Sequence, residues 1–167
     1  KRSIEIGGLE LTTRLDRVDE LSDGRRIVID YKTRAPSAST MLGERPEEPQ
    51  LPLYLVTAEP AAVAVAFAQV KTGEMRFTAL ARDGDLLPGR KVKVLGESRH
   101  ADQHAIWEDQ VAAWHADLAR IAADFIGGNA KIDPKTYPHT CRYCDVRSVC
   151  RIYERAGNEF TEQEEEG

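Results

Sequence analysis

The sequence predicts a small α/β domain whose central sheet begins with a hairpin. Apolar and polar residues alternate over residues 9–21, a short turn follows, and residues 27–32 form an apolar run, which together indicate two paired strands. Apolar residues recur at spacings of three and four over residues 103–126, which is one stripe of an amphipathic helix. The chain has 167 residues, the length of about one domain, and a domain of that size buries roughly 70% of its unfolded surface.

The first half of the chain is predicted to consist of strands, one turn and one loop. Residues 1–10 are typical of a strand, and the alternation over residues 9–21 is typical of a half-buried one. The triplet Ser-Asp-Gly at 22–24 indicates a turn that leads into the strand at 27–32. Residues 35–49 are rich in Pro, Ser and Glu, which predicts a loop.

The second half combines helices and strands. The expected elements are, in chain order, a short helix at 50–57, a strand buried on both faces at 62–70, a strand at 75–81, a long loop at 83–103 and the helix at 103–126. Pro52 lies in the first turn of the short helix, where proline is tolerated. Gly127 and Gly128 end the long helix, because glycine is favoured just past a helix terminus.

The bulk properties exclude several classes of protein. The net charge of −5 argues against a surface coated with positive charge for non-specific DNA binding, although a local basic groove stays compatible with it. No stretch approaches the roughly 20 apolar residues that cross a membrane, and the first residues are typical of a strand rather than a signal peptide. Three clustered cysteines do not fit a secreted disulfide framework. We therefore expect a cytoplasmic protein with no membrane partner.

An apolar strand that ends in Asp30-Tyr31-Lys32 is the clearest chemical signal in the sequence. Residues two apart in a strand project to the same face, so Asp30 and Lys32 are expected to lie side by side. Ile27, Ile29 and Tyr31 are then expected to face the core. An Asp-x-Lys pair at a strand end is also common as surface decoration, so a second carboxylate is needed to indicate a site.

The predicted turn determines which carboxylate faces Asp30. In a three-residue hairpin loop, Gly24 takes the left-handed conformation that such loops require. Leu21 then pairs with Arg25, and counting back places Asp16 directly opposite Asp30, with Cβ atoms about 4.5–5.5 Å apart on one face. A two-residue loop would shift the register by one and remove this pairing.

Two carboxylates at this distance repel each other unless a cation lies between them. Mg²⁺ suits such a pair, because it is a hard ion that takes oxygen ligands and keeps several waters for a phosphate to displace. The same register places Asp19 opposite Ile27 on the other face, so we expect Asp16 rather than Asp19 to be the ligand. Lys32 would then orient the attacking water and stabilise the charge that grows on the phosphate.

Three motifs resemble the RecB-type branch of the PD-(D/E)xK nucleases. They are Arg-Leu-Asp-Arg-Val-Asp at 14–19, Val-Ile-Asp-Tyr-Lys-Thr at 28–33 after Gly24, and Gln-Leu-Pro-Leu-Tyr at 50–54. Their order and spacing cover about the first sixty residues. The resemblance implies a restriction-endonuclease-like core, with helices flanking a mixed central sheet, and the nuclease domain of a bacterial DNA-repair protein.

The resemblance also implies the roles of the strand residues. Asp16 and Asp30 would bind Mg²⁺ or Mn²⁺, and the Tyr31 carbonyl would be the third ligand. Lys32 would be the catalytic lysine.

Gln50 and Tyr54 are implied to lie on a helix beside the site, and positions four apart do share one helix face. Without the resemblance they fit equally well as a polar residue and a half-buried aromatic on a surface helix. The domain is expected to span 1–156, followed by an acidic flexible tail at 157–167. Because the family carries a further His or Glu on a helix upstream of the first strand, we interpret this chain as a fragment that begins after that helix.

Cys141, Cys144 and Cys150, within a segment at 139–151, have the spacing of a soft-metal site. A resemblance to AddB-like and CRISPR-associated relatives implies a [4Fe–4S] cluster that staples the C-terminal segment to the N-terminal part. Its fourth cysteine would lie upstream of this chain, so we expect the cluster to be absent from the fragment. The alternatives are a zinc site with His139 as fourth ligand, or three ordinary reduced thiols.

These observations predict a metal-dependent DNA nuclease that acts on single-stranded DNA or DNA ends in recombinational repair, with a helicase-type partner subunit. The alternative from another class is a catalytically silent, nuclease-derived module that binds DNA or a protein. Intact Asp16, Asp30 and Lys32 favour the enzyme, because a binding module has no need of all three. A nuclease of the same fold that acts on RNA or in restriction is a third possibility.

Overall fold

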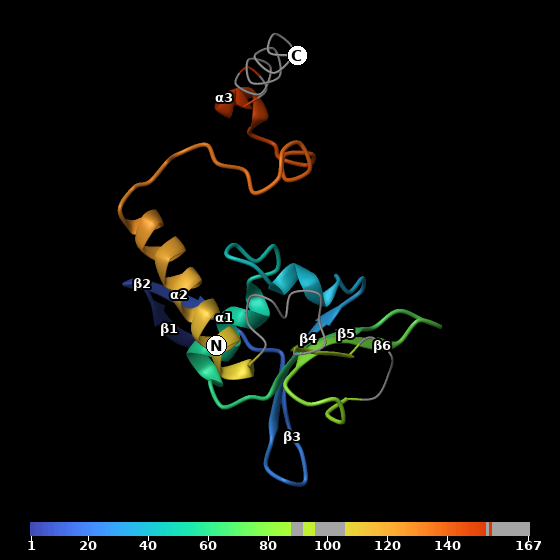
Figure 1. Ribbon diagram of the computed structural model, residues 1–167. Helices are drawn as coiled ribbons and strands as arrows, with labels where there is room; N and C mark the ends of the chain where they lie inside the picture. The colour runs from blue at the N-terminus through green and yellow to red at the C-terminus, as the bar shows by residue number, and fades with distance from the viewer. Residues whose placement is uncertain (88–91, 96–105, 153, 155–167) are drawn as a thin grey trace, which may run out of the picture. The chain divides into compact units, whose positions relative to one another are not determined.

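The computed structural model describes residues 1–87, 92–95, 106–152 and 154 (Figure 1). The chain divides into two compact units, Lys1–Gly128 and Asn129–Gly167, and each is described by itself. Among the described residues, no helix is both long and apolar enough to span a membrane.

A five-stranded mixed sheet forms the centre of the first unit. Its strands, in spatial order, are β3 (Arg17–Glu20), β4 (Arg26–Lys32), β5 (Ala64–Gln69), β6 (Arg76–Ala81) and β7 (Val92–Val94). The β3–β4 and β5–β6 pairs are antiparallel, whereas the β4–β5 and β6–β7 pairs are parallel. This mixed sheet, with helices packed against it, confirms the predicted restriction-endonuclease-like α/β fold.

The β3–β4 hairpin has the register that the sequence predicts. The backbone N–H of Leu21 donates a 2.8 Å hydrogen bond to the Arg25 carbonyl, and Gly24 has a φ of +85°. Asp19 pairs with Ile27, as counted from the turn. The three-residue loop is therefore confirmed.

The predicted continuous strand at 9–21 is wrong, because it is divided between two sheets. Its first part is β2 (Leu9–Thr13), which pairs with β1 (Arg2–Ile6) in a separate two-stranded sheet. Its second part is β3, and residues 14–16 carry the chain from one sheet to the other. The alternation is kept in β2 but not in β3, so the sequence pattern indicated strand residues without indicating the change of partner strand.

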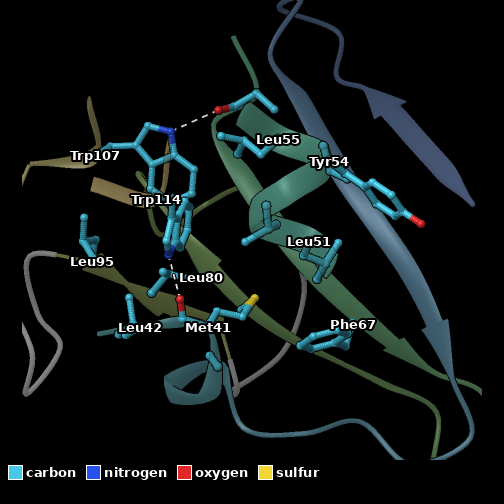
Figure 2. Packing of buried hydrophobic residues seen from close by; sticks show 14 residues of the cluster. Met41, Leu42, Leu51, Tyr54, Leu55, Phe67, Leu80, Leu95, Trp107 and Trp114 are labelled. Carbon is cyan, nitrogen blue, oxygen red and sulfur yellow. Dashed lines mark hydrogen bonds between the residues drawn. The ribbon is translucent and has the colours of Figure 1, made fainter. Parts of the chain in front are cut away.

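Two helices and a short 3₁₀ helix cover one face of the central sheet. They are α1 (Gln50–Ala58), α2 (Trp107–Ile126) and η1 (Ala38–Met41). We call the cluster that they form with the sheet the helix-side core, and its largest members are Met41, Leu51, Tyr54, Leu55, Phe67, Leu80, Leu95, Trp107 and Trp114 (Figure 2). The two tryptophan rings meet edge to face at 5.9 Å.

Both tryptophans also have their indole N–H groups satisfied inside this core. Trp107 donates a 3.0 Å hydrogen bond to the Ala62 carbonyl, and Trp114 donates a 2.7 Å bond to the Met41 carbonyl (Figure 2). A buried indole N–H without a partner would cost stability, so these two bonds fix the rotation of α2 against the sheet.

On the opposite face of the sheet, β5 and β6 contribute alanines to a second core cluster. This cluster, the alanine-face core, contains Ile27, Ile29, Val63, Ala64, Ala66, Ala68, Ala79, Ala81 and Leu86. All six residues of β5 are buried, which confirms the prediction of a strand buried on both faces.

The remaining helix and loop predictions hold in part. The helix predicted at 50–57 is α1, and the loop predicted at 35–49 contains η1. The loop predicted at 83–103 contains β7, whereas residues 88–91 and 96–105 lie outside the described residues. The buried face of α2 passes through Trp114, Leu118 and Ala122. Phe125, near the end of the helix, lies off this face and is 73% exposed.

The second unit contains the short helix α3 (Arg147–Cys150) and the three cysteines. Nothing in the structure tests the predicted domain boundary at residue 156, and the predicted tail at 157–167 lies outside the described residues.

Gly7 joins β1 to β2 at a close approach to α2, and its replacement tests that contact. In Gly7→Ala, the new Cβ would lie 2.2 Å from the Ala119 carbonyl oxygen, at a φ of +55°. We expect the free energy of unfolding to fall by about 3 kcal/mol, from steric overlap together with left-handed strain.

The matched control is Gly73→Ala, at a φ of +76° with no atom within 4 Å of the new Cβ. It carries the backbone strain alone and should lose about 1–2 kcal/mol in the same urea titration. Equal losses in the two variants would contradict a tight Gly7–α2 contact.

Candidate functional site

Asp30 is the buried carboxylate of the candidate site. It lies on β4, between β3 and β5, and is 2% exposed. Its Oδ1 accepts a 2.8 Å hydrogen bond from Gln50 Nε2. Its Oδ2 lies 2.8 Å from Lys32 Nζ in an ion pair, but in the described part of the chain this oxygen accepts no hydrogen bond of good geometry. One oxygen of a buried carboxylate therefore retains capacity for a further ligand.

Asp16 lies across the hairpin from Asp30 and is exposed. The β3–β4 ladder ends at the Arg17–Ile29 pair, so one further step along both strands reaches Asp16 and Asp30. Asp16 Oδ2 accepts a 3.2 Å hydrogen bond from the backbone N–H of Tyr31. The structure thus brings together the two carboxylates that the turn register predicts to be opposed.

Lys32 projects to the same face as Asp30, two residues along β4. Its Nζ donates a 2.9 Å hydrogen bond to Gln50 Oε1, in addition to the ion pair with Asp30. The same atom lies 5.9 Å from the centroid of the Phe67 ring. Phe67 was not among the predicted site residues, although it belongs to the apolar run that forms β5.

Gln50 connects the strand residues to α1. Its Oε1 faces Lys32, and its Nε2 donates both to Asp30 and, at 3.1 Å, to the Tyr54 hydroxyl. The Tyr54 hydroxyl in turn donates a 2.8 Å hydrogen bond to the Arg14 carbonyl. Gln50 and Tyr54, predicted to share a helix face beside the site, are therefore both bonded to the segment that carries the carboxylates.

Burial and neighbouring charges shift the ionisation of the strand residues. Burial raises the pKa of Asp30, Lys32 opposes this rise, and the nearby Asp16 adds to it. The contact with Asp30 raises the pKa of Lys32, and the negative charge of Glu48 contributes. Glu48 was not predicted, because nothing distinguishes it in sequence from the other acidic residues of the loop before α1.

Gln69 is a second polar residue that the prediction missed. It is 3% exposed at the end of β5, where its Oε1 accepts a 3.3 Å hydrogen bond from the Ala35 N–H and its Nε2 donates at 3.2 Å to Glu74. These bonds hold the segment that leaves β4 next to the end of β5. A glutamine that ends an otherwise apolar buried strand was the available signal.

The Tyr31 side chain does not face the core, which corrects the prediction. It is 42% exposed, because it lies past the last paired residues of β3, and its hydroxyl accepts a 3.0 Å hydrogen bond from Arg17 Nη1. The Arg17 guanidinium also bonds Asp19, and these two contacts raise the pKa of Arg17.

The three cysteines belong to the second unit, where each thiol is free and partly exposed. Among the described residues, no group of three or more His, Cys, Asp or Glu side chains is gathered as in a metal site. Within the described residues, Cys141, Cys144 and Cys150 are therefore not gathered as the ligands of a metal site. The Asp16–Asp30 pair supplies two side-chain oxygen donors of a different kind.

The mixed sheet and the groups at the end of β4 define a restriction-endonuclease-like protein. The family model of the PD-(D/E)XK nuclease superfamily matches residues 2–151. The chain therefore belongs to the PD-(D/E)XK nuclease superfamily, whose members are generally nucleases and usually use divalent metals such as Mg²⁺. No curated protein and no solved structure matches the chain.

The raised pKa of Asp30 gives a pH-dependent prediction. Since the folded protein binds this proton more tightly than the unfolded chain, stability falls as pH rises from the unfolded pKa through the folded pKa. Asp30→Asn, studied in EDTA, should therefore raise the free energy of unfolding at neutral pH and lose this gain at a pH below the unfolded pKa of the carboxyl. Urea titrations at both pH values measure it.

The control is Asp145→Asn, an exposed carboxylate of the second unit, which should change little at either pH. A neutral-pH loss of stability in Asp30→Asn would show that the Lys32 and Gln50 contacts outweigh the burial of the charge.

Proposed function

We propose that this chain is a metal-dependent deoxyribonuclease domain in which Asp16, Asp30 and Lys32 form the catalytic centre. The observation that carries the proposal is the Asp30 Oδ2 atom, which is buried and ion-paired with Lys32 but accepts no hydrogen bond of good geometry in the described part of the chain. An exposed carboxylate, Asp16, lies across the hairpin from it, and an ammonium group lies 2.8 Å away on the same strand. A stabilising surface cluster would not keep a carboxylate oxygen buried in this state.

The donor set fits Mg²⁺ or Mn²⁺, which prefer oxygen ligands. Asp16 and Asp30 would hold the ion together with the Tyr31 carbonyl. The N–H of Tyr31 points to Asp16, and the N–H and C=O of one strand residue face the same neighbouring strand, so this carbonyl belongs to the Asp16 side. When bound, the ion polarises the phosphodiester and lowers the pKa of a water molecule.

Lys32 supplies a positioned positive charge beside the reacting group. Gln50 Oε1 holds one of the three ammonium donors, and the ion pair with Asp30 fixes the direction of the side chain. The other donors can orient the attacking water and bind a phosphate oxygen as its negative charge grows. Because the pKa of Lys32 is raised, the group stays protonated at neutral pH and acts as a donor rather than as a base.

Gln50 and Tyr54 act as positioning residues. Gln50 joins Asp30 to Lys32, and Tyr54 joins Gln50 to the Arg14 carbonyl, two residues before Asp16. The network therefore sets the separation of the two carboxylates through α1.

The finer assignment rests on motif spacing. We place the chain in the RecB-like branch, with single-stranded DNA or DNA ends as substrate, recombinational repair as context, a helicase-type subunit as partner, and residues 1–156 as the nuclease domain. The cluster on Cys141, Cys144 and Cys150 stays a prediction for the longer protein.

Cleavage of end-labelled single-stranded DNA by the full chain in Mg²⁺ or Mn²⁺ tests the proposal. Lys32→Met should lower the cleavage rate by about 10²–10³-fold, because it removes a charge aimed at the transition state. EDTA should abolish cleavage. The control Lys71→Met removes an exposed lysine of the β5–β6 turn and should keep wild-type rates.

Metal-dependent DNA binding without cleavage, equal in wild type and Lys32→Met, would favour the catalytically silent binding module. Cleavage that survives both EDTA and Lys32→Met would place the activity elsewhere.

Replacement of Gln50 separates positioning from catalysis. Gln50→Met removes the bonds to Asp30, Lys32 and Tyr54 while keeping the length of the side chain. We expect about a 10–100-fold loss of activity, because an outer partner of the metal ligands is removed. Raised Mg²⁺ should recover part of this loss if the ligands are only displaced, whereas Lys32→Met should not be recovered. A wild-type rate at low Mg²⁺ would rule out the role of Gln50.

A further inference from the structure

We propose that Arg17, held by Asp19, is a positioning residue that clamps Tyr31 from the rear face of the hairpin and so fixes the metal-binding edge at the front. The inference rests on the proposed function, since it concerns the same pair of carboxylates. It assigns a role to Arg17, to Asp19 and to the side chain of Tyr31, whose carbonyl alone enters the proposed metal site.

The site lies just past the end of the backbone ladder. The last paired residues of β3 and β4 are Arg17 and Ile29, and Asp16 and Asp30 are one step further. At that step Tyr31 gives its N–H to a carboxylate oxygen of Asp16 instead of a backbone carbonyl. The spacing of the two strands at the site therefore depends on side-chain contacts.

Arg17 makes such a contact on the other face of the hairpin. Since Arg17 pairs with Ile29 and Asp19 pairs with Ile27, both side chains lie on the rear face, away from the Asp30 side chain. From there Arg17 Nη1 donates a 3.0 Å hydrogen bond to the Tyr31 hydroxyl, and Arg17 Nε donates to Asp19 Oδ1. A side chain of β3 thereby binds the end of β4 on the rear face of the hairpin.

Asp16 and Arg17 are consecutive, and both hold Tyr31. Asp16 binds its backbone N–H at the front, and Arg17 binds its hydroxyl at the rear. A cation at the front would compete for the Asp16 oxygen that accepts the N–H bond, whereas the rear contact would be unaffected. The Tyr31 side chain is 42% exposed, so packing restrains only part of it. The hydrogen bond from Arg17 restrains its hydroxyl end.

A direct phosphate contact is the obvious alternative for Arg17. Asp19 pairs with its charge and accepts from Nε, and the Tyr31 hydroxyl accepts from Nη1, so two of the five guanidinium donors already bind protein partners. A phosphate contact predicts weaker, less salt-dependent DNA binding in the variant. A positioning role predicts weaker metal binding with no DNA present.

The test is the affinity of the full-length chain for Mn²⁺ without DNA, measured by the electron paramagnetic resonance signal of free Mn²⁺. Tyr31→Phe removes only the hydroxyl, and Arg17→Ala removes the clamp. We expect both to bind Mn²⁺ about tenfold more weakly than wild type, the lower end of the effect of outer partners on metal sites. Arg17→Lys should recover part of the affinity lost in Arg17→Ala.

Two further variants serve as controls for the Mn²⁺ affinity. Arg26→Ala removes an arginine that pairs with Glu20 and Glu59 at the other end of the same hairpin, and it should bind Mn²⁺ like wild type. Asp30→Ala should not bind the ion.

Wild-type Mn²⁺ affinity in Tyr31→Phe and Arg17→Ala would overturn the clamp and leave the proposed function intact. Absence of Mn²⁺ binding by the wild type would overturn both. Should Arg17→Ala fail to fold, Tyr31→Phe decides the question alone, since it removes one exposed hydroxyl.

Discussion

Burial of the Asp30 charge is the constraint that the surrounding structure satisfies. A carboxylate in an apolar setting is costly unless charges and hydrogen bonds compensate it. Lys32 offers the charge from the same strand, and Gln50, the first residue of α1, offers the hydrogen bond. Helix α1 must therefore begin directly over the end of β4, and Leu51 and the residues that follow it then fill the helix-side core. The position of a core helix and the chemistry of the site follow from one requirement.

The two faces of the central sheet are packed with side chains of different size. The helix-side core is built from large side chains, and Trp107 and Trp114 place α2 through hydrogen bonds to backbone carbonyls. The alanine-face core combines alanines of β5 and β6 with Ile27 and Ile29 of β4. Close packing makes such an interior resist distortion, so the end of β4 is carried by a stiff support. At the edge strand β3, the backbone pairing with β4 ends at Arg17 and Ile29, and side-chain contacts take its place beyond them.

Local sequence was sufficient for the features that depend on local geometry. The Ser-Asp-Gly turn predicted the hairpin register, and the register predicted that Asp16 faces Asp30. The helix that carries Gln50 and Tyr54 followed from its pattern and from family resemblance. Features that depend on distant partners could not be predicted: the division of the strand at residues 14–16 reflects two different sheets, and the exposure of Tyr31 reflects the short length of β3. Glu48 is recognised only by its position in space.

The hydrogen bonds that Asp16, Gln50 and Tyr54 make at the candidate site join groups within residues 14–54, that is, a hairpin and the start of the crossover helix. Contacts close in sequence require little loop-closure entropy and form early in folding. The helix that covers this region, α2, is far away in the chain and joins it through long-range contacts such as Trp114 to Met41. We therefore expect the contacts of the charged centre to form early in folding, before α2 packs against α1.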